Sequence, residues 1–236
     1  MLTAPRLTTA LAVLMASLAI ASPTPLDVNK RQLATCAPVH LFVARGTTEP
    51  PGDGSIGSLA QLVLRANPGA TKESIDYPAS SDPTYIDDVT IGIEAVTEQV
   101  TSYVSACPNS TLVLMGYSQG AQIILDALCG SGGPELGGTG EPTISPEQGA
   151  KIAAVVGYGD PGRVNGESWN QGTATRNGMY ARTAGACDAW ADRIHSYCNS
   201  GDPFCATGGN ILVHMSYPQT FNTQASRWIN QQIRSQ

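Results

Sequence analysis

The chain has 236 residues, a formal net charge of −6 at pH 7 and six cysteines. The acidic balance argues against nucleic acids and anionic membranes as partners, because those partners select basic surfaces. Beyond the N-terminal region, no segment approaches the roughly 20 apolar residues of a membrane-spanning helix. We therefore expect no stable membrane insertion.

The N-terminal region has the pattern of a secretory leader. Arg6 precedes a short apolar run over residues 11–20, which leads into an Ala-x-Ala cleavage site. This pattern predicts a signal peptide over residues 1–21 and a secreted, extracellular protein. Residues 22–31 are polar and end in a Lys-Arg pair, which predicts a pro-peptide. Residues 32–236 would then form a single catalytic domain, long enough to bury a full core.

Along the rest of the chain, apolar residues recur at spacings typical of alternating strands and helices. In chain order we expect a strand at 39–44, a helix at 59–66, a short strand at 74–78, a helix from 89 to about 107, a strand at 112–115, a helix at 122–129, a strand at 151–158 and a helix at about 220–233. Short apolar strands between helices indicate parallel strands that are covered on both faces. The predicted fold class is α/β, a three-layer α/β/α sandwich with a central, mainly parallel sheet. Active sites in such sheets gather at the carboxyl ends of the strands.

A Gly-Tyr-Ser-Gln-Gly sequence at 116–120 separates one expected strand from the next helix. A tight strand-to-helix turn lifts a serine hydroxyl clear of the backbone, and its two glycines let the strand and the helix pass closely. A lone G-x-S-x-G is a weak signal, since a structural turn can contain the same residues. In this strand-turn-helix setting we favour Ser118 as a nucleophile, which then needs a base to remove its proton.

Three histidines are candidates for that base. His40 lies inside the first strand and precedes Ser118, so we expect it in the core or at the sheet edge. His195 is expected in an exposed turn. His214 follows the serine, as the chain order of this architecture requires, and we favour it as the base.

An acid must precede His214 and be held rigidly, because it fixes the imidazole tautomer and stabilises the imidazolium. Asp202 lies in a loop that a disulfide between Cys198 and Cys205 would hold, and that short loop is the cheapest one to close. Asp160 directly ends a strand and remains the alternative. The need for rigid support favours Asp202.

The even number of cysteines fits a secreted disulfide framework. No pair has the C-x-x-C spacing of a metal site, so we expect no metal. Asn109 begins the one Asn-x-Ser/Thr sequon of the chain and is a candidate for N-glycosylation.

Several spaced segments together indicate a family. They are Cys36 before the first strand, Ala44-Arg45-Gly46-Thr47-Thr48-Glu49 after it, Cys107-Pro108, the turn from Gly116 to Ala121, the stretch from Tyr197 to Cys205, and His214. Over nearly the whole mature chain, these segments resemble the fungal cutinases and the related acetylxylan esterases, which are small serine esterases with an α/β-hydrolase-like fold. Several matches in the right order are far more specific than any single motif.

The resemblance implies a catalytic triad of Ser118, Asp202 and His214, and so it favours this acid over the one that ends a strand. It also implies an oxyanion hole at Thr47 and Gln119. Preorganised donors at such a place stabilise the negative charge that develops on the carbonyl oxygen during acyl transfer. Without the resemblance, we would interpret Thr47 as a plain loop residue.

The resemblance also implies three disulfides: Cys36–Cys107, Cys198–Cys205 and, from the two cysteines that are left, Cys129–Cys187. The last bridge looks like the extra one of acetylxylan esterases. The implied chemistry is acylation of the serine by an ester and hydrolysis of the acyl-enzyme by water. It needs no metal or organic cofactor.

The residues expected around the site indicate the substrate. Its rim is expected to be formed by Leu212, Val213 and Met215 beside the histidine, with Pro78, Tyr85 and Ile86 opposite. Apolar side chains there suit an aliphatic acyl chain. We therefore predict cutinase-like hydrolysis of cutin-type or short- to medium-chain aliphatic esters.

Two other hypotheses remain. An acetylxylan esterase is favoured by the Cys129–Cys187 bridge, and Trp169, Tyr180 and Trp190 could stack on sugar rings unless they pack in the core. A non-catalytic secreted binding protein would lack a triad or oxyanion residue, and the sequence lacks none. For an enzyme, the expected partner is an ester or polyester of the plant cuticle or cell wall, and we expect a monomer.

Overall fold

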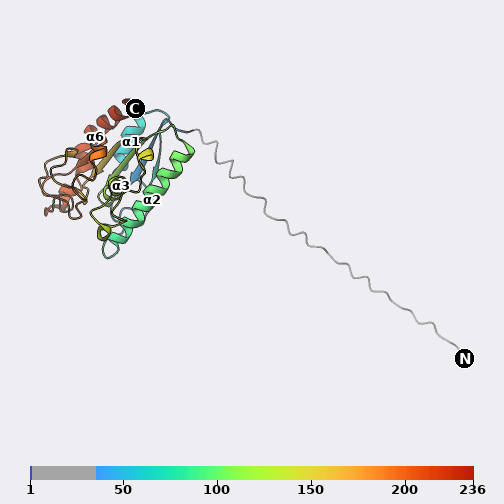
Figure 1. Cartoon of the computed structure of the whole chain (residues 1–236), viewed down its shortest axis with the longest axis horizontal. Helices are drawn as coiled ribbons and strands as arrows, with labels where there is room; N and C mark the ends of the chain where they lie inside the picture. Colours follow the sequence, from blue (N-terminus) through green and yellow to red (C-terminus); the bar gives the residue numbers. More distant parts are fainter. Residues whose placement is uncertain (2–35) are drawn as a thin grey trace. The chain divides into compact units, whose positions relative to one another are not determined.

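The computed structural model describes Met1 and residues 36–236, so the expected pro-peptide and, apart from Met1, the expected signal peptide lie outside the described residues (Figure 1). In the described part, a sheet of six strands has the order β2-β1-β3-β4-β6-β5. All neighbouring strands are parallel. Their bounds are β1 Val39–Ala44, β2 Thr71–Ser74, β3 Thr111–Tyr117, β4 Ile152–Tyr158, β5 Asn170–Gln171 and β6 Ile194–Tyr197.

Helices connect these strands and cover the sheet. The described helices are α1 Gly57–Ala66, α2 Tyr85–Ala106, α3 Gln119–Cys129, α4 Pro146–Gly149, α5 Ile211–His214 and α6 Tyr217–Arg234, with 3₁₀-helices η2 Pro134–Leu136 and η3 Asp188–Arg193. Among residues 36–236, no helix is both long and apolar enough to cross a bilayer.

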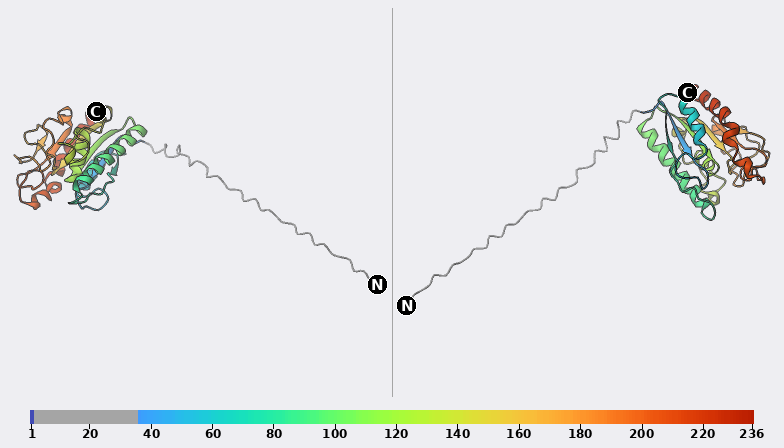
Figure 2. Two further views of the ribbon diagram at one scale, coloured as in Figure 1. Left: turned by 60° about the horizontal axis from the view of Figure 1, so that its bottom comes forward. Right: turned by 180° about the vertical axis from the view of Figure 1, so that it is seen from behind.

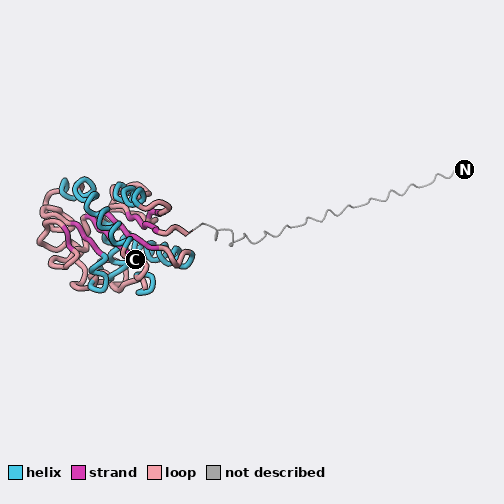
Figure 3. Tube along the Cα trace, turned by 90° about the horizontal axis from the view of Figure 1, so that it is seen from above, coloured by secondary structure: helices cyan, strands magenta, loops and turns pink. Residues whose placement is uncertain are grey.

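The sheet divides the core into two parts, and β1 contributes to both because its side chains alternate between the two faces. Phe42 and Ala44 pack with residues of α2 and α3, whereas Leu41 and Val43 pack with residues of α1 and α6. The right-hand view of Figure 2 shows α2 and α6 on opposite sides of the strands. Figure 3 shows the strands between the layers of helices. The predicted three-layer α/β/α sandwich is confirmed.

The strand expected at 74–78 is wrong in its position. Strand β2 ends at Ser74 and is polar, which suits its place at the edge of the sheet. The sequence suggests a strand there because Ile75 and Tyr77 are apolar at alternate positions. In the structure both are buried. The Ile75 N–H still donates to the Val43 carbonyl, but the pairing with β1 ends there, since its register runs from Thr71 to Ser74. Burial of alternate residues therefore continues beyond the pairing.

Strands β5 and β6 are absent from the sequence prediction. Strand β6 reads Ile-His-Ser-Tyr, too short and too polar to stand out, yet it pairs with β4 and is mostly buried. The expectation of an exposed turn at His195 is therefore wrong. Its imidazole stacks on the Trp228 ring of α6, with centroids 3.7 Å apart.

The structure contains the three disulfides that the resemblance implies. Cys36–Cys107 ties the start of β1 to the end of α2, and Cys129–Cys187 ties the end of α3 to the start of η3. Cys198–Cys205 closes a short loop after β6. Asn109, the candidate for glycosylation, lies exposed in the turn between α2 and β3.

Candidate active site

Ser118 forms the sharp turn between β3 and α3. Its φ of 56° lies in the left-handed region that residues other than glycine rarely adopt. The Ser118 N–H donates a 2.7 Å hydrogen bond to the Tyr158 carbonyl at the end of β4, which anchors the strained residue. Ser118 is 7% exposed and lines a cavity at the carboxyl edge of the sheet. The turn therefore holds one hydroxyl in the cavity wall.

Two glycines make this turn sterically feasible. A Cβ on Gly116 would lie 2.3 Å from the Gly120 carbonyl oxygen, and a Cβ on Gly120 would lie 2.2 Å from the Ala44 carbonyl oxygen. Both distances are far below van der Waals contact, and the atoms that would be met belong to the backbone. The start of α3 therefore lies directly against β1 and β3, and the packing itself requires the G-x-S-x-G pattern.

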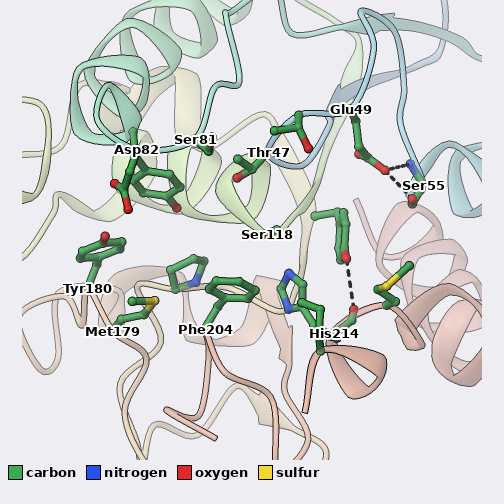
Figure 4. A pocket seen from close by; sticks show the side chains of 16 residues that line it. Thr47, Glu49, Ser55, Ser81, Asp82, Ser118, Met179, Tyr180, Phe204 and His214 are labelled. Carbon is green, nitrogen blue, oxygen red and sulfur yellow. Dashed lines mark hydrogen bonds between the residues drawn. The ribbon is translucent and has the colours of Figure 1, made fainter. Parts of the chain in front are cut away.

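His214, at the end of α5, is the histidine that is placed to act as a general base. Its Nδ1 lies 2.7 Å from Oδ2 of Asp202, and the two residues are 4% and 0% exposed. The imidazole points toward Ser118 (Figure 4). A carboxylate on Nδ1 favours the tautomer that carries its proton there, so Nε2 is left to accept a proton.

Asp202 accepts four hydrogen bonds. Oδ2 accepts from His214 and from the Tyr217 hydroxyl at 2.6 Å. Oδ1 accepts from the N–H groups of Phe204 at 2.7 Å and Cys205 at 3.1 Å. Burial alone would raise the pKa of Asp202, but the hydrogen bonds and the charge of His214 outweigh it and hold this pKa below its usual value. Burial and the neighbouring carboxylate raise the pKa of Tyr217, which therefore stays a phenol that can donate.

Asp160 has a different partner. Its Oδ2 lies 2.6 Å from Nη1 of Arg182, and the same guanidinium has its Nε 2.6 Å from Oδ1 of Asp126. All three side chains are buried. This cluster joins α3 to the loop after β4, and the structure brings His214 to Asp202 and not to Asp160.

The other two histidines lie outside the cavity. His40 is buried, with Nδ1 2.7 Å from the Thr71 hydroxyl and its ring stacked on Tyr103 at 3.8 Å, as expected for a core or sheet-edge residue. Burial lowers the pKa of His195 to about 4, so its imidazole is neutral at neutral pH. Neither residue lines the cavity that contains Ser118.

Thr47 and Gln119 lie together beside the serine. The Thr47 hydroxyl is 3.4 Å from Oε1 of Gln119, and Thr47 lines the cavity. Gln119 is the first residue of α3, so its backbone N–H has no acceptor within the helix. The buried Gln119 side chain donates to the Tyr85 carbonyl at 3.2 Å. The free N–H of Gln119 beside the nucleophile is one of the donors that an oxyanion hole requires.

A buried arginine fixes the loop that carries Thr47. The Arg45 Nε donates to the Glu49 carbonyl at 2.9 Å, and its Nη2 donates to the Pro78 carbonyl at 3.1 Å. The Glu49 carboxylate accepts from the Gly46 N–H at 2.6 Å. The position of Thr47 is therefore set by charge-assisted hydrogen bonds on both sides, which is the support that a preorganised donor needs.

The cavity has a volume of about 520 Å³. It is lined by Thr47, Thr48, Glu49, Ser55, Ser81, Asp82, Tyr85, Tyr117, Ser118, Pro161, Met179, Tyr180, Phe204, Ile211, His214 and Met215 (Figure 4). Part of its mouth is apolar. Met179, Ile211 and Met215 are 49%, 49% and 61% exposed, and Leu212 beside them is 70% exposed. These four are most of the large hydrophobic side chains that are exposed among the described residues.

The expected rim is placed in part. Tyr85 and Met215 line the cavity, whereas Ile86, Leu212 and Val213 do not. Ile86 follows Tyr85 on α2 and packs against the core, because successive helical residues point in different directions. Leu212 projects into solvent from α5. Pro78 is also absent from the lining.

Of the three aromatic residues considered for sugar stacking, one lines the cavity and two do not. Trp169 is buried in the core, and Trp190 packs against the core and over Gly149. Tyr180 lines the cavity and stacks on Tyr85, with ring centroids 5.2 Å apart. Sequence reasoning missed Met179, Phe204 and Ile211 as lining residues, although Phe204 belongs to the quoted stretch that ends at Cys205.

Comparisons with known proteins find relatives of this chain. A family model described as Cutinase matches residues 35–233. Acetylxylan esterase of Hypocrea jecorina is 39% identical, over 95% of this chain and 77% of its own length. Cutinase 11 of Verticillium dahliae is 38% identical, over 85% of this chain and 70% of its own length.

Solved structures of similar proteins have the same fold. The catalytic core domain of acetyl xylan esterase from Trichoderma reesei has a TM-score of 0.80 and 38% sequence identity, covering 84% of this chain and 99% of its own. The cutinase of Trichoderma reesei in complex with a phosphonate inhibitor has a TM-score of 0.61 and 23% identity, covering 84% and 77%. The second likeness concerns the fold alone.

Proposed function

The chain belongs to the cutinase family and is a serine ester hydrolase, and from this premise we propose that Ser118, His214 and Asp202 are its catalytic triad. The proposal rests on one observation above all: the buried His214 imidazole is held by Asp202 at 2.7 Å and points toward the hydroxyl of the strained turn. This is the order of nucleophile, base and orienting acid that acyl transfer needs.

The reaction would begin with attack of the Ser118 Oγ on the ester carbonyl carbon. Nε2 of His214 takes the hydroxyl proton, and Asp202 stabilises the imidazolium that forms. The tetrahedral intermediate carries its negative charge on the former carbonyl oxygen. The backbone N–H groups of Thr47 and Gln119 would donate to that oxygen, and each such donor contributes about 3 kcal/mol to transition-state stabilisation.

The second half of the reaction uses the same groups. The imidazolium of His214 protonates the departing alcohol, which leaves an acyl group on Ser118. A water molecule then gives its proton to Nε2 and attacks the acyl carbonyl. Collapse of this second intermediate releases the acid, and the imidazolium of His214 returns its proton to the oxygen of Ser118, which restores the serine.

The apolar part of the mouth supports aliphatic esters as substrates. Met179, Ile211 and Met215 surround a site that also contains the Phe204 ring, and Leu212 extends the apolar surface outward. Large exposed hydrophobic side chains that gather at one place mark a surface for an apolar ligand. We therefore favour cutin-type or short- to medium-chain acyl esters, cleaved at Ser118.

Removal of acetyl groups from xylan is the second candidate. The placement of Tyr180 in the cavity favours it, since an aromatic ring can pack against a sugar. The relatives divide between the two activities, because one is named acetylxylan esterase and another Cutinase 11, at nearly equal identity. We further propose that the protein is secreted, which the three disulfides support, and that it acts as a monomer on an ester of the plant cuticle or cell wall.

A chain-length series tests the proposal. Hydrolysis of p-nitrophenyl acetate, butyrate and octanoate should have its highest kcat/KM at butyrate or octanoate, and the Ser118→Ala variant should be inactive. A second assay should compare acetate release from acetylated xylan with hydrolysis of cutin. Action confined to acetate esters would replace the first candidate by the second, and no hydrolysis by the wild-type protein would refute both.

A further inference from the structure

We propose that Asp82 and Tyr180 form a subsite for the alcohol half of the ester, and that this alcohol carries several hydroxyl groups, as a sugar or another polyol does. The inference rests on the proposed function, because it takes Ser118 as the point of cleavage. It assigns a part of the cavity that the catalytic groups leave unused.

The polar groups at the two ends of the cavity differ in whether they already have hydrogen-bond partners. Asp82 and Tyr180 lie at one end, Glu49 and Ser55 lie at the other, and Ser118 and His214 lie between them (Figure 4). The Glu49 carboxylate is already occupied, since it accepts from the Ser55 N–H at 2.8 Å and from the backbone of its own loop. Its end of the cavity therefore offers little to a ligand.

The Asp82 and Tyr180 end offers free polar atoms. The Asp82 side chain is exposed, lines the cavity, and has no hydrogen-bond or ion-pair partner among the described residues. Its carboxylate and the Tyr180 hydroxyl point toward each other across the cavity (Figure 4). Burial, and after it the negative charge of Asp82, raise the pKa of Tyr180, so its hydroxyl stays protonated and can both donate and accept.

The wall that carries Tyr180 is held by several contacts. The Tyr180 N–H donates to the Pro161 carbonyl at 2.9 Å, and the ring stacks on Tyr85, whose hydroxyl donates to Oε1 of Gln122 at 2.9 Å. Two residues later, Arg182 is held between two buried carboxylates. A ligand that contacts the Tyr180 ring therefore removes little freedom from that side chain, which lowers the cost of binding.

Met179 lies beside Tyr180 at this end (Figure 4), but the polar atoms of Asp82 and Tyr180 favour the alcohol half over an acyl chain. Placing an aliphatic chain against an unpaired carboxylate would remove water from the charge without compensation. Two neighbouring hydroxyl groups of a sugar can instead donate to the two carboxylate oxygens of Asp82, while the Tyr180 ring and hydroxyl contact the same molecule. A simple alcohol can make only part of these contacts.

The test keeps the acyl group constant and changes the alcohol. Acetylated xylo-oligosaccharide, glycerol monoacetate and p-nitrophenyl acetate are compared for the wild type, Asp82→Ala and Tyr180→Phe. Because hydrogen bonds to a charged group are lost, Asp82→Ala should raise KM for the xylo-oligosaccharide roughly tenfold or more. Its kcat/KM on p-nitrophenyl acetate should stay within about twofold, since that alcohol has no free hydroxyl groups. A rise in KM confined to glycerol monoacetate, whose alcohol half has two free hydroxyl groups, would support a small polyol in place of a sugar.

A matched control removes a charge nearby. Asp87 is exposed in the first turn of α2 and does not line the cavity, so Asp87→Asn should leave all three substrates unaffected. If Asp82→Ala changes all three substrates equally, or changes none of them, the subsite is refuted although the enzyme remains an esterase.

Binding without turnover separates the subsite from the proposed reaction. In the Ser118→Ala background, titration calorimetry with unacetylated xylohexaose and with glycerol should show binding of one of them. Adding Asp82→Ala should weaken that binding roughly tenfold or more. The absence of any difference would overturn the inference whether or not the wild-type protein hydrolyses esters.

Discussion

Replacing Tyr217 with phenylalanine should weaken the support of Asp202 while the ring packing stays in place. The lost hydroxyl donates a 2.6 Å hydrogen bond to Oδ2 of Asp202 and accepts a 3.0 Å hydrogen bond from the Asn199 N–H. Tyr217 is 0% exposed, so neither group regains a partner from bulk solvent. The substitution therefore tests whether this phenol positions the acid of the triad.

The magnitude follows from the two hydrogen bonds. One to a charged group contributes about 1.5–3 kcal/mol, and a neutral one contributes about 0.5–1.5 kcal/mol, so the loss in the free energy of unfolding should be about 2–4 kcal/mol at pH 7. For a chain of this size, that loss lowers Tm by roughly 5–15 °C. The fall in kcat should be far smaller than the roughly 10⁴-fold cost of a wrong imidazole tautomer, because Asp202 keeps its bond to His214.

The loss should also depend on pH in one direction. The folded protein holds the pKa of Asp202 below its usual value, so the stability that comes from this carboxylate is present above the unfolded pKa of about 4. It disappears as the pH falls through the lower, folded pKa. Tyr217→Phe removes one cause of the lowering, so the difference from wild type should be full at pH 7 and should shrink below about pH 4.

The assay is urea unfolding at several pH values, together with kcat on p-nitrophenyl butyrate. Tyr158→Phe is the matched control, because Tyr158 stacks in the same cluster and its hydroxyl donates to Oδ1 of Asn222 at 3.1 Å, away from Asp202. The control should lose about 1 kcal/mol, with no dependence on pH and unchanged kcat. A Tyr217→Phe loss that equals the control, or that persists unchanged at pH 3, would refute this role of Tyr217.

Three further substitutions test other parts of the structure. Arg182→Met should lower the free energy of unfolding, measured in urea at pH 7, by about 3–5 kcal/mol, since two buried carboxylates lose their partner. A loss below about 1 kcal/mol would contradict the importance of this partner for the two carboxylates. Joint replacement of Cys129 and Cys187 by alanine should cost about 2–4 kcal/mol and leave kcat on p-nitrophenyl acetate unchanged, and a large fall in kcat without loss of stability would contradict a purely structural bridge. Met215→Ser should raise KM for p-nitrophenyl octanoate by roughly 5–20-fold through lost apolar contact and should hardly alter KM for the acetate, whereas equal changes for both esters would show that Met215 does not contact the acyl chain.

Local constraints explain why the nucleophile turn could be predicted. A Cβ on Gly116 would meet the backbone of Gly120 and Ala121 in the same turn, and a Cβ on Gly120 would meet the end of β1, so both glycines of the pattern are fixed by backbone packing. The pairing of Asp202 with His214 needed more, because a rigid loop could be inferred from Cys198 and Cys205 but the rival Asp160 could not be dismissed by spacing. The partner of Asp160 is Arg182, and no local sequence pattern predicts an ion pair between residues so far apart in the chain.

The cavity wall was harder to predict because side-chain direction and long-range contacts decide it. Ile211 and Met215 both line the cavity and Leu212 does not, because residues four apart on a helical turn share a face whereas successive residues point in different directions. Tyr180 lies at the cavity because its N–H donates to the carbonyl of Pro161, which lies in the loop after β4 and also lines the cavity. Tyr217 had one usable signal, because it follows His214 by three residues and so lies near the same loop.

Labelling with diethyl p-nitrophenyl phosphate tests the nucleophile most directly. An activated serine should release one p-nitrophenolate per protein molecule, and mass spectrometry should find the diethyl phosphate on the peptide that contains Ser118. Loss of esterase activity should follow labelling in proportion, and Ser118→Ala should take up no label. Labelling at another residue, or an active Ser118→Ala enzyme, would contradict the assignment of Ser118 as the residue that attacks the ester.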